Sequence, residues 1–359
     1  MQVDVLIVGA GFAGASTAFH LSRSFPGSIL VIDQESVPGF HASGRNAAMV
    51  RQHEEREDIR RAAAASRRAY GEYESELGFR QVGSLLLGPA NRLEAMREPD
   101  RIESYLLSPQ EARRRVPLLD RHEFGAALWT PADGIMDISA LLQLYLTGSR
   151  ERGVSFLFDC QLRGCRGTGP FRIDTTQGEI TARRLVNAAG AWAPPVGRLA
   201  GASPVPMRPL KRHLFVLGRV PGVNPHWPIV WNLADNFYFR PESDGLLISV
   251  CDEGETESLE PTVDADMTEA LARLCWSRLP HLRDAVQERV WSCFRTKASD
   301  TSFVIGWDPE RENLFWVAAL GGHGMGVSWE VGRRAAKKFL DRAHSDSFDP
   351  DRFQFALRP

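Results

Sequence analysis

Three glycines near the N-terminus have the spacing of a phosphate-binding turn. Gly9, Gly11 and Gly14 form a G-x-G-x-x-G pattern directly after an apolar, β-branched segment at residues 3–8. The first glycine permits a tight turn, the second lets the backbone approach a pyrophosphate, and the third lets a helix pack closely on the strand. The helix would direct unpaired N–H groups and its positive dipole end at the phosphates. The pattern predicts a dinucleotide-binding turn.

A carboxylate at a suitable distance strengthens this prediction. Asp33 ends a second apolar segment, residues 28–32, and lies nineteen positions after Gly14. An acidic residue about 20 positions beyond the glycines binds the ribose hydroxyls in turns of this kind. We therefore interpret residues 3–33 as a strand, a helix over about 15–25, and a second strand.

The predicted elements along the rest of the chain indicate two discontinuous domains, because nucleotide-type elements occur at both ends and in the middle. Between them lie β segments of mixed character, bounded by prolines. We predict helices over residues 57–77, 108–115, 137–152, 267–279 and 328–340. We predict strands over residues 81–87, 154–158, 171–175, 179–182, 184–192, 212–217, 237–240, 245–250 and 315–320, and one more within 119–133.

Composition excludes several classes of function. A formal charge of −2 with 25% charged residues gives no net attraction to nucleic acid. No apolar run reaches the ~18 residues of a membrane span, and a strand beginning within the first three residues leaves no room for a secretory signal. The five cysteines are scattered and lack zinc-site spacing. We expect a cytoplasmic protein without a metal site, with peripheral association at the inner membrane as the alternative.

Four segments rich in glycine and other small residues together resemble one family, the FAD-dependent amine and amino-acid oxidoreductases. This family includes D-amino-acid dehydrogenases, glycine oxidase and sarcosine oxidase. The segments are Val8–Gly14, Ala42–Ala48, Val186–Trp192 and Val317–Gly326. The first alone is typical of any dinucleotide-binding protein, whereas all four in this order are specific. Asn236–Pro241 and Cys293–Arg295 are most similar to the D-amino-acid dehydrogenases.

The resemblance implies an α/β fold of mixed α+β character, in which a Rossmann-like FAD-binding domain is interleaved with a mixed-β-sheet substrate domain. The FAD-binding domain would comprise residues 1–78, 134–205 and 297–359, and the substrate domain residues 79–133 and 206–296. The implied cofactor-binding residues are Gly9, Gly11, Phe12, Ala13, Gly14, Asp33, Gln34, Ser43, Gly44, Arg45, Asn46, Ala47, Ala48, Met49, Leu162, Ala188, Ala189, Gly190, Trp192, Gly306, Gly321, Gly322, His323, Gly324, Met325 and Gly326.

The implied reaction is hydride transfer from an amine-bearing carbon to the flavin, which needs a group that orients the substrate carboxylate. We favour Arg295 with Tyr238 for this role, because a planar guanidinium can bind a carboxylate through two bonds. Arg212 is a further candidate, and so is Arg51, since sarcosine oxidases also place a carboxylate-binding arginine after the flavin loop. His323 lies in the loop at the flavin edge, where its backbone matters more than its imidazole.

Departures from the family pattern refine these expectations. Gly326 stands where sarcosine-type oxidases carry a lysine that activates oxygen, which favours a dehydrogenase passing electrons to a quinone or another acceptor. Cys293 begins a C-x-x-T stretch that bonds FAD in some oxidases, but non-covalent dehydrogenases share this region, so we expect non-covalent FAD. Met49 and Val50 replace the His-Tyr pair of the D-arginine type, which favours a neutral or apolar side chain on the substrate.

Several alternatives stay open. A glycine or sarcosine type of oxidase would instead reduce oxygen to hydrogen peroxide. A relative acting on 2-hydroxy acids could use the same carboxylate-binding groups. A flavoprotein subunit or assembly factor would bind FAD mainly to dock partners. Substrate stereochemistry and oligomeric state are not fixed by the fold.

Overall fold

The computed structural model describes residues 1–98, 100–256 and 258–357, and the chain divides into two compact units. The first unit consists of Met1–Asn46, Ile138–Leu210 and the chain from Phe294 onward. The second consists of Ala47–Asp137 and Lys211–Cys293. Each unit is therefore assembled from separate stretches of sequence, which confirms the prediction of interleaved domains.

The first unit is built on a largely parallel sheet. Its strand order is β18-β19-β11-β1-β2-β8, with only β18 antiparallel to its neighbour along this path, and the hairpin β9–β10 extends from β11. The strands are β1 (Gln2–Val8), β2 (Ile29–Ile32), β8 (Ser155–Leu157), β9 (Leu162–Arg166), β10 (Phe171–Thr175), β11 (Gly178–Asn187), β18 (Val304–Trp307) and β19 (Leu314–Ala318). The central strands β1 and β2 are apolar and buried because helices and strands cover both faces of the sheet.

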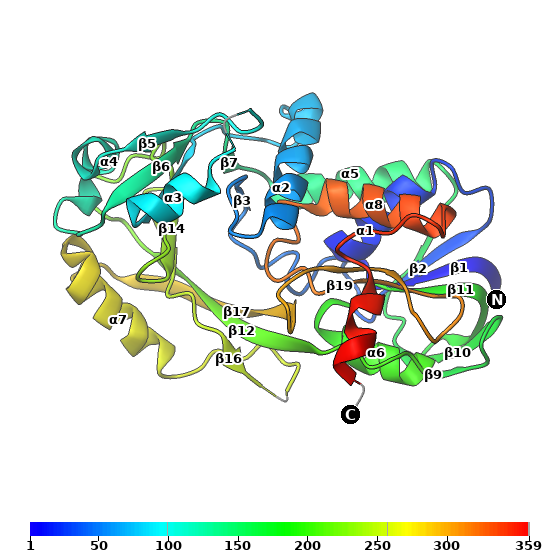
Figure 1. Ribbon diagram of the computed structural model, residues 1–359. Coiled ribbons are helices and arrows are strands. Elements are labelled where there is room, and N and C mark those ends of the chain that lie inside the picture. Colours follow the sequence, from blue (N-terminus) through cyan, green and yellow to red (C-terminus); the bar gives the residue numbers. More distant parts are fainter. Residues whose placement is uncertain (99, 257, 358–359) are drawn as a thin grey trace. The chain divides into compact units, whose positions relative to one another are not determined.

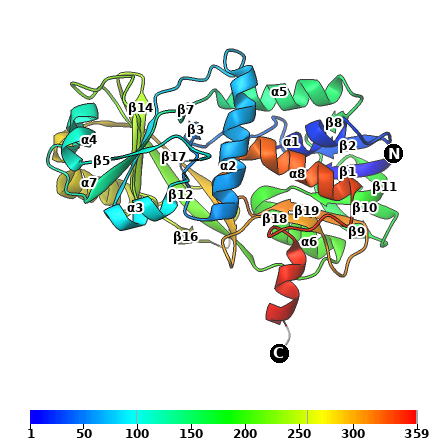
Figure 2. The ribbon, with the colours of Figure 1, turned by 45° about the horizontal axis from the view of Figure 1, so that its top comes forward.

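Three helices lie on one face of this sheet, and a fourth lies on the other with the β9–β10 hairpin (Figures 1 and 2). The three are α1 (Phe12–Leu21), α5 (Ile138–Arg150) and α8 (Ser328–Leu340), and the fourth is α6 (Ala193–Ala200). Gly332 of α8 explains the close packing of α1 on α8, since a Cβ there would lie 2.5 Å from the carbonyl oxygen of Ser16. The strand, turn and helix predicted at the N-terminus are confirmed, although the helix spans Phe12–Leu21 rather than 15–25.

The second unit contains most of a mixed sheet of nine strands in the order β16-β12-β15-β14-β13-β4-β6-β5, with β17 also paired to β12. The first residues of β12, up to Leu210, and the last residues of β17, from Phe294, group with the first unit. The strands are β4 (Ser84–Gly88), β5 (Tyr105–Leu107), β6 (Ala126–Thr130), β12 (Met207–Leu217), β13 (Ile229–Asn232), β14 (Phe237–Glu242), β15 (Gly245–Ser249), β16 (Gly254–Glu255) and β17 (Gln287–Ala298). Strands β3 (Met49–Val50) and β7 (Gly134–Ile135) form a separate pair. The helices are α2 (Glu57–Tyr70), α3 (Ala90–Met96), α4 (Pro109–Arg115) and α7 (Met267–Arg278).

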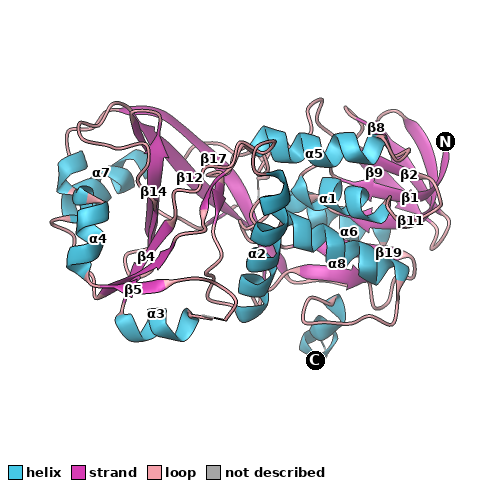
Figure 3. Ribbon diagram, turned by 90° about the horizontal axis from the view of Figure 1, so that it is seen from above, coloured by secondary structure: helices cyan, strands magenta, loops and turns pink. Residues whose placement is uncertain are grey.

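The two faces of this sheet differ because side chains alternate along each strand. One face is apolar and packs with residues of α4 and α7, which Figure 3 shows together on the same side. Its core includes Phe215, Phe237, Phe239 and Leu271. The alternate positions of the same strands carry two smaller apolar clusters together with Trp231, Tyr238 and Ser249. We call this second face the polar face, because the predicted site residue Tyr238 lies on it.

Some predicted boundaries are wrong. The helix expected over 57–77 ends at Tyr70, where the chain tightens into a 3₁₀ turn at Gly71–Tyr73, because glycine is a poor helix former. The two strands expected at 179–182 and 184–192 are one strand, β11, which ends at Asn187. Strand β13 and strand β17 were not predicted. No helix in the described part of the chain has the length and apolar character of a membrane span.

The boundary between the units also differs from the expected one. Residues 47–78 group with the second unit, not with the first. Hydrogen bonds explain this: Gln52 donates to Asp133, and Nε of Arg67 donates to the carbonyl oxygen of Ala132 at 2.6 Å. The segment after residue 46 is therefore anchored to the turn between β6 and β7. Which unit binds cofactor and which binds substrate stays a prediction.

Candidate functional site

The turn after β1 requires glycine at two positions. Gly9 has φ +106°, and a Cβ there would lie 2.5 Å from the carbonyl oxygen of Ala188. A Cβ on Gly14 would clash with the carbonyl oxygen of Gly9. The first glycine therefore admits the end of β11, and the third lets α1 begin directly against the turn, as the spacing predicted.

Asp33 lies beside this turn. Its Oδ2 accepts a hydrogen bond from the backbone N of Ala10 at 2.6 Å, and its Oδ1 accepts one from the backbone N of Glu35 at 3.0 Å. Burial raises the pKa of Asp33, although these two bonds act to lower it. The carboxylate predicted to bind ribose hydroxyls is therefore hydrogen-bonded to the backbone of the glycine turn.

The second small-residue segment meets the start of α1. Ser43 Oγ accepts a hydrogen bond from the backbone N of Phe12 at 3.0 Å. A Cβ on Gly11 would lie 2.8 Å from the same oxygen. Asn46 Nδ2 donates to the carbonyl oxygen of Ser43 at 2.6 Å, which closes the loop. The segments that contain Gly11 and Ser43 are thus in direct contact.

The third segment, at the end of β11, turns beneath the first. Asn187 is fully buried, and its Nδ2 donates to the carbonyl oxygen of Ala193 at 2.8 Å. The chain then enters a 3₁₀ turn at Gly190–Trp192, with Gly190 at φ +57°. The Trp192 ring lies 4.4 Å from the ring of His41, whose Nε2 is 2.8 Å from Glu35 Oε1.

The fourth segment forms the loop between β19 and α8. Gly321 and Gly322 have φ values of +57° and +93°. A Cβ on Gly322 would lie 2.7 Å from Nε of Arg295, so this arginine packs directly on the loop backbone. His323 donates its backbone N–H to the carbonyl oxygen of Leu320, and α8 begins five residues later at Ser328. The loop therefore leads into a helix N-terminus, with its unpaired N–H groups and positive dipole end.

These features fit a bound FAD. Helices α1 and α8 both begin at glycine-rich loops within the first unit, and such helix starts favour anionic groups. In addition, Nδ1 of His41 is buried without a hydrogen-bond partner in the described part of the chain. Of the other predicted cofactor residues, Leu162 belongs to the apolar core and Gly306 packs against Asp349. Ala47, Ala48 and Met49 group with the second unit.

A row of side chains crosses the polar face of the second sheet. Trp231 on β13 is directly opposite Tyr238 on β14, and Tyr238 is directly opposite Ser249 on β15. The rings of Trp231 and Tyr238 are stacked, with centroids 4.6 Å apart. The guanidinium of Arg51 lies over the Trp231 ring, 4.1 Å from its centroid. Arg51 and Tyr238, both predicted site residues, are therefore joined through Trp231.

The hydrogen bonds of Arg51 leave part of its guanidinium open. Its Nη2 donates to Oε1 of Glu54 at 2.8 Å, and this is its only hydrogen bond among the described residues. The side chain is 10% exposed. Its Nε and remaining Nη thus keep N–H groups that could bind a carboxylate.

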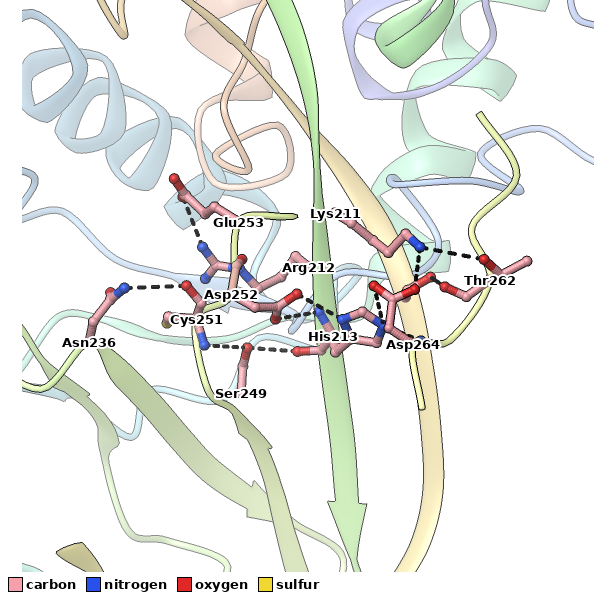
Figure 4. A network of polar contacts seen from close by, with 11 residues as sticks. Lys211, Arg212, His213, Asn236, Ser249, Cys251, Asp252, Glu253, Thr262 and Asp264 are labelled. Atoms are coloured by element: carbon pink, nitrogen blue, oxygen red, sulfur yellow. Dashed lines mark hydrogen bonds and ion pairs between the residues drawn. The ribbon is translucent and has the colours of Figure 1, made fainter. Parts of the chain in front are cut away.

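Arg212, in contrast, is engaged in a buried network on β12 (Figure 4). Its Nε donates to the carbonyl oxygen of Asp252 at 2.7 Å, and its Nη2 pairs with Glu253 at 3.0 Å. The neighbouring His213 is fully buried, with Nδ1 2.7 Å from Asp252 Oδ2, and its Nε2 accepts from the backbone N of Asp264. These contacts hold the loops after β15 against β12 and indicate a structural role for Arg212, although its buried Nη1 has no hydrogen-bond partner in the described part of the chain.

Asp133 anchors the main chain next to Arg51. It is fully buried, its Oδ1 accepts from the backbone N and from Nε2 of Gln52, and its Oδ2 accepts from Ser84 Oγ at 2.6 Å. Burial raises the pKa of Asp133 to about 6, although Ser84, Gln52 and Arg51 act to lower it. The adjacent His53 contacts Thr130 Oγ1 at 3.0 Å, and burial lowers the pKa of this histidine to about 4.

Sequence reasoning missed Trp231 and Asp133. Trp231 lies on β13, a strand that was not predicted, and 180 positions separate it from Arg51. Asp133 lies in a turn, 81 positions after Gln52. No motif connects residues at such distances, and only the tertiary structure brings them together. Arg295 and His323 belong to the first unit, whereas Tyr238, Arg51 and Arg212 belong to the second.

Comparisons with known proteins agree with this architecture. The model of the family described as FAD dependent oxidoreductase (DAO) matches residues 4–338. Mitochondrial dimethylglycine dehydrogenase of Rattus norvegicus is 27% identical over 278 residues, covering 72% of this chain and 32% of that protein, so the chain spans about a third of this relative's length. L-proline dehydrogenase from P. horikoshii has a TM-score of 0.88 at 23% identity, covering 99% of both chains. Glycine oxidase from Geobacillus kaustophilus has a TM-score of 0.81 at 23% identity, covering 98% of both chains.

Proposed function

Because the chain belongs to the family of FAD-dependent oxidoreductases, we propose that it oxidises the C–N bond of an amino acid. The bound flavin would supply the acceptor for a hydride from the α-carbon. The nitrogen lone pair then forms the C=N bond of an imine, which water hydrolyses to a 2-oxo acid and an amine. The first unit would hold FAD and the second would bind the substrate.

The observation that carries this proposal is the environment of the Arg51 guanidinium and the N–H groups that it leaves unused. The guanidinium is stacked on Trp231, is largely buried, and keeps donors that no described residue uses. A carboxylate is the complementary ligand, because guanidinium and carboxylate form charge-assisted hydrogen bonds through two parallel contacts. We therefore propose Arg51 as a carboxylate ligand, with Tyr238 extending the aromatic surface beside it.

Arg295 is the second candidate for the same role. It packs on the backbone of Gly322, in the loop that leads to α8, and belongs to the FAD-binding unit. Its position on β17, two residues after Cys293, puts both side chains on the same face of that strand. A substrate carboxylate bound by Arg295 would be held next to the loop proposed to contact the flavin.

The proposed substrate class is an N-substituted glycine or a D-amino acid. Similarity to dimethylglycine dehydrogenase supports the first, and the resemblance of Asn236–Pro241 to the D-amino-acid dehydrogenases supports the second. Gly326, which stands where sarcosine-type oxidases carry lysine, supports an electron acceptor other than oxygen. We propose a quinone or a comparable acceptor, and non-covalent binding of FAD, with a bond to Cys293 as the alternative.

Anaerobic reduction of the flavin tests the function directly. FAD-loaded protein is mixed without oxygen with N,N-dimethylglycine, sarcosine, L-proline, glycine and D-alanine, and loss of the yellow absorption band is recorded. Bleaching by one class identifies the substrate, and peroxide formation in air would indicate an oxidase. A flavin that none of these compounds bleaches would contradict amino-acid oxidation and favour a subunit or assembly factor.

Two arginine variants test the carboxylate ligand. Arg51→Gln should raise KM by about 100-fold, because two charge-assisted bonds are lost, and Arg295→Gln measures the rival site in the same assay. Arg61→Gln is the matched control, since this arginine is exposed on α2 and pairs only with Glu57 among the described residues. Unchanged KM in Arg51→Gln would exclude Arg51 as the ligand.

A further inference from the structure

We propose that Trp231 is a positioning residue that holds the guanidinium of Arg51 in place for binding the substrate carboxylate. This inference rests on the proposed function, because it assigns Trp231 a role that acts through Arg51. Two contacts of the same indole carry it: the Arg51 guanidinium lies over the Trp231 ring, and the Trp231 ring is stacked with the Tyr238 ring.

Trp231 is well fixed by its own surroundings. It lies on β13 in the interior of the nine-stranded sheet, opposite Tyr238 on one side and Leu86 on the other. Its ring also packs against two apolar clusters, one with Tyr238 and Cys293 and one with Leu86 and Leu128. A ring that is held on both sides presents a rigid face to Arg51.

The main chain at Arg51 is fixed separately from its side chain. Asp133 Oδ1 accepts the N–H of the peptide bond that joins Arg51 to Gln52, at 3.2 Å. This bond sets where the side chain starts, but several rotatable bonds separate the backbone from the guanidinium. Nη2 of Arg51 donates to Glu54, but a single hydrogen bond still allows the guanidinium to rotate about it. The flat face of Trp231 supplies the remaining restraint on the guanidinium plane.

The physical reason for an indole at this place is the negative face of its π-system. A guanidinium over an indole face gains cation–π attraction, and this attraction is larger when the pair is shielded from water. Trp231 and Arg51 are both largely covered. Removal of the indole should therefore weaken carboxylate binding by about tenfold, which corresponds to about 1.4 kcal/mol.

A double-mutant cycle tests the inference. Trp231→Leu, Trp231→Phe, Arg51→Gln and the double variant Trp231→Leu/Arg51→Gln are compared by KM, by kcat and by the Kd of acetate, a carboxylate probe. We expect Trp231→Leu to raise KM and the Kd about tenfold with kcat changed less than twofold. Trp231→Phe should recover part of the loss. In the Arg51→Gln background, Trp231→Leu should add nothing, because Trp231 acts only through Arg51.

A second measurement keeps the test independent of turnover. Stacking on an indole shifts the NMR resonance of the Arg51 Nε–H group through the ring current, and Trp231→Leu should abolish this shift in the substrate-free protein. Trp276→Leu is the matched control, since Trp276 on α7 is 67% exposed. It should leave KM, Kd and the Arg51 resonance unchanged.

The outcomes separate the two hypotheses. If Arg51→Gln weakens acetate binding but Trp231→Leu does not, or if the two effects add fully, the role of Trp231 is overturned while the proposed function stands. If the parent protein neither oxidises amino acids nor binds acetate, the proposed function fails. An Arg51 resonance that is indifferent to Trp231→Leu overturns the positioning role whatever the activity.

Discussion

The two units of this protein differ in the physical means by which we propose that they recognise small molecules. In the first unit the predicted contacts come from backbone: Gly9 and Gly14 admit close neighbours that any side chain would displace, and two helices begin at glycine-rich loops. In the second unit they come from side chains, with the Arg51 guanidinium over the Trp231 ring and the Trp231 ring stacked with Tyr238. Recognition by backbone needs glycine positions without a Cβ, whereas recognition by side chains needs particular functional groups at particular positions.

This difference explains why the sequence reveals the candidate site of the first unit more clearly than that of the second. A glycine needed for close approach leaves a local pattern, because the turn, the helix and the strand are consecutive in the chain. A stack across a sheet leaves none, since Arg51 and Trp231 meet only after strands distant in sequence have paired. The contrast predicts that substitutions in the first unit change FAD affinity, whereas those on the sheet face change substrate affinity.

The largest effect should follow from Gly14→Ala. A Cβ at this position clashes with the carbonyl oxygen of Gly9, which neither backbone segment can relieve locally. We expect FAD affinity to fall more than 100-fold, measured by titration of the apoprotein with FAD. Gly254→Ala is the control, because a Cβ there meets no atom within 4 Å. Normal FAD binding by Gly14→Ala would refute backbone recognition.

The next largest effect concerns Arg212, for which its contacts in the network of Figure 4 lead us to propose a structural role. Arg212→Gln should lower the free energy of unfolding by about 3 kcal/mol, because a buried guanidinium loses its charge-assisted hydrogen bonds to the carbonyl oxygen of Asp252 and to Glu253. KM should stay within twofold of the parent value. Denaturant unfolding and steady-state kinetics on the same preparation check both parts. A raised KM without loss of stability would return Arg212 to the substrate site.

A smaller effect should appear as a pH dependence of stability at His20. Burial lowers the pKa of His20 from 6.5 to about 4, so between these values the unfolded chain binds more protons than the native one. Stability therefore falls as pH decreases through this window, by about 2 kcal/mol at pH 5. His20→Phe should have nearly the parent Tm at pH 7 and a higher Tm at pH 5. Parallel Tm curves for the two proteins would contradict this prediction.

The smallest effects come from a matched pair of serines, one in each unit. Ser43→Ala removes the acceptor for the N–H of Phe12, and Ser84→Ala removes the donor to Asp133. Each change should cost about 1 kcal/mol, or roughly fivefold. Ser43→Ala should weaken FAD binding with KM unchanged, and Ser84→Ala the reverse. A raised KM in Ser43→Ala and weakened FAD binding in Ser84→Ala would contradict the proposal that the first unit binds FAD and the second binds substrate.

Much of the first unit could be predicted from sequence. The N-terminal strand, turn and helix and the four small-residue segments were found, because each depends on neighbours close in the chain. The end of the second helix was misplaced, since only the tertiary structure shows that the chain tightens at Gly71. The grouping of residues 47–78 with the second unit was missed for a similar reason: it depends on bonds from Gln52 and Arg67 to the β6–β7 turn.

The site in the second unit was only partly visible. Arg51 and Tyr238 were named through the family resemblance, but nothing in the sequence shows that one aromatic ring joins them. Arg212 was named beside them, and its network shows a guanidinium largely occupied by Asp252 and Glu253. Residue type alone does not distinguish an arginine held by two partners in a network from one held by a single ion pair.

The sequence by itself determined the glycine-rich turns, the alternation of strands and helices, and the class of cofactor that such turns accept. It did so because backbone conformation at glycine and local periodicity are properties of short segments. Only the tertiary structure decided which polar side chains face one another, through a sheet register that pairs β13 with β14 and β4. That register is set by burial of an apolar face shared by many strands, which is a property of the folded chain as a whole.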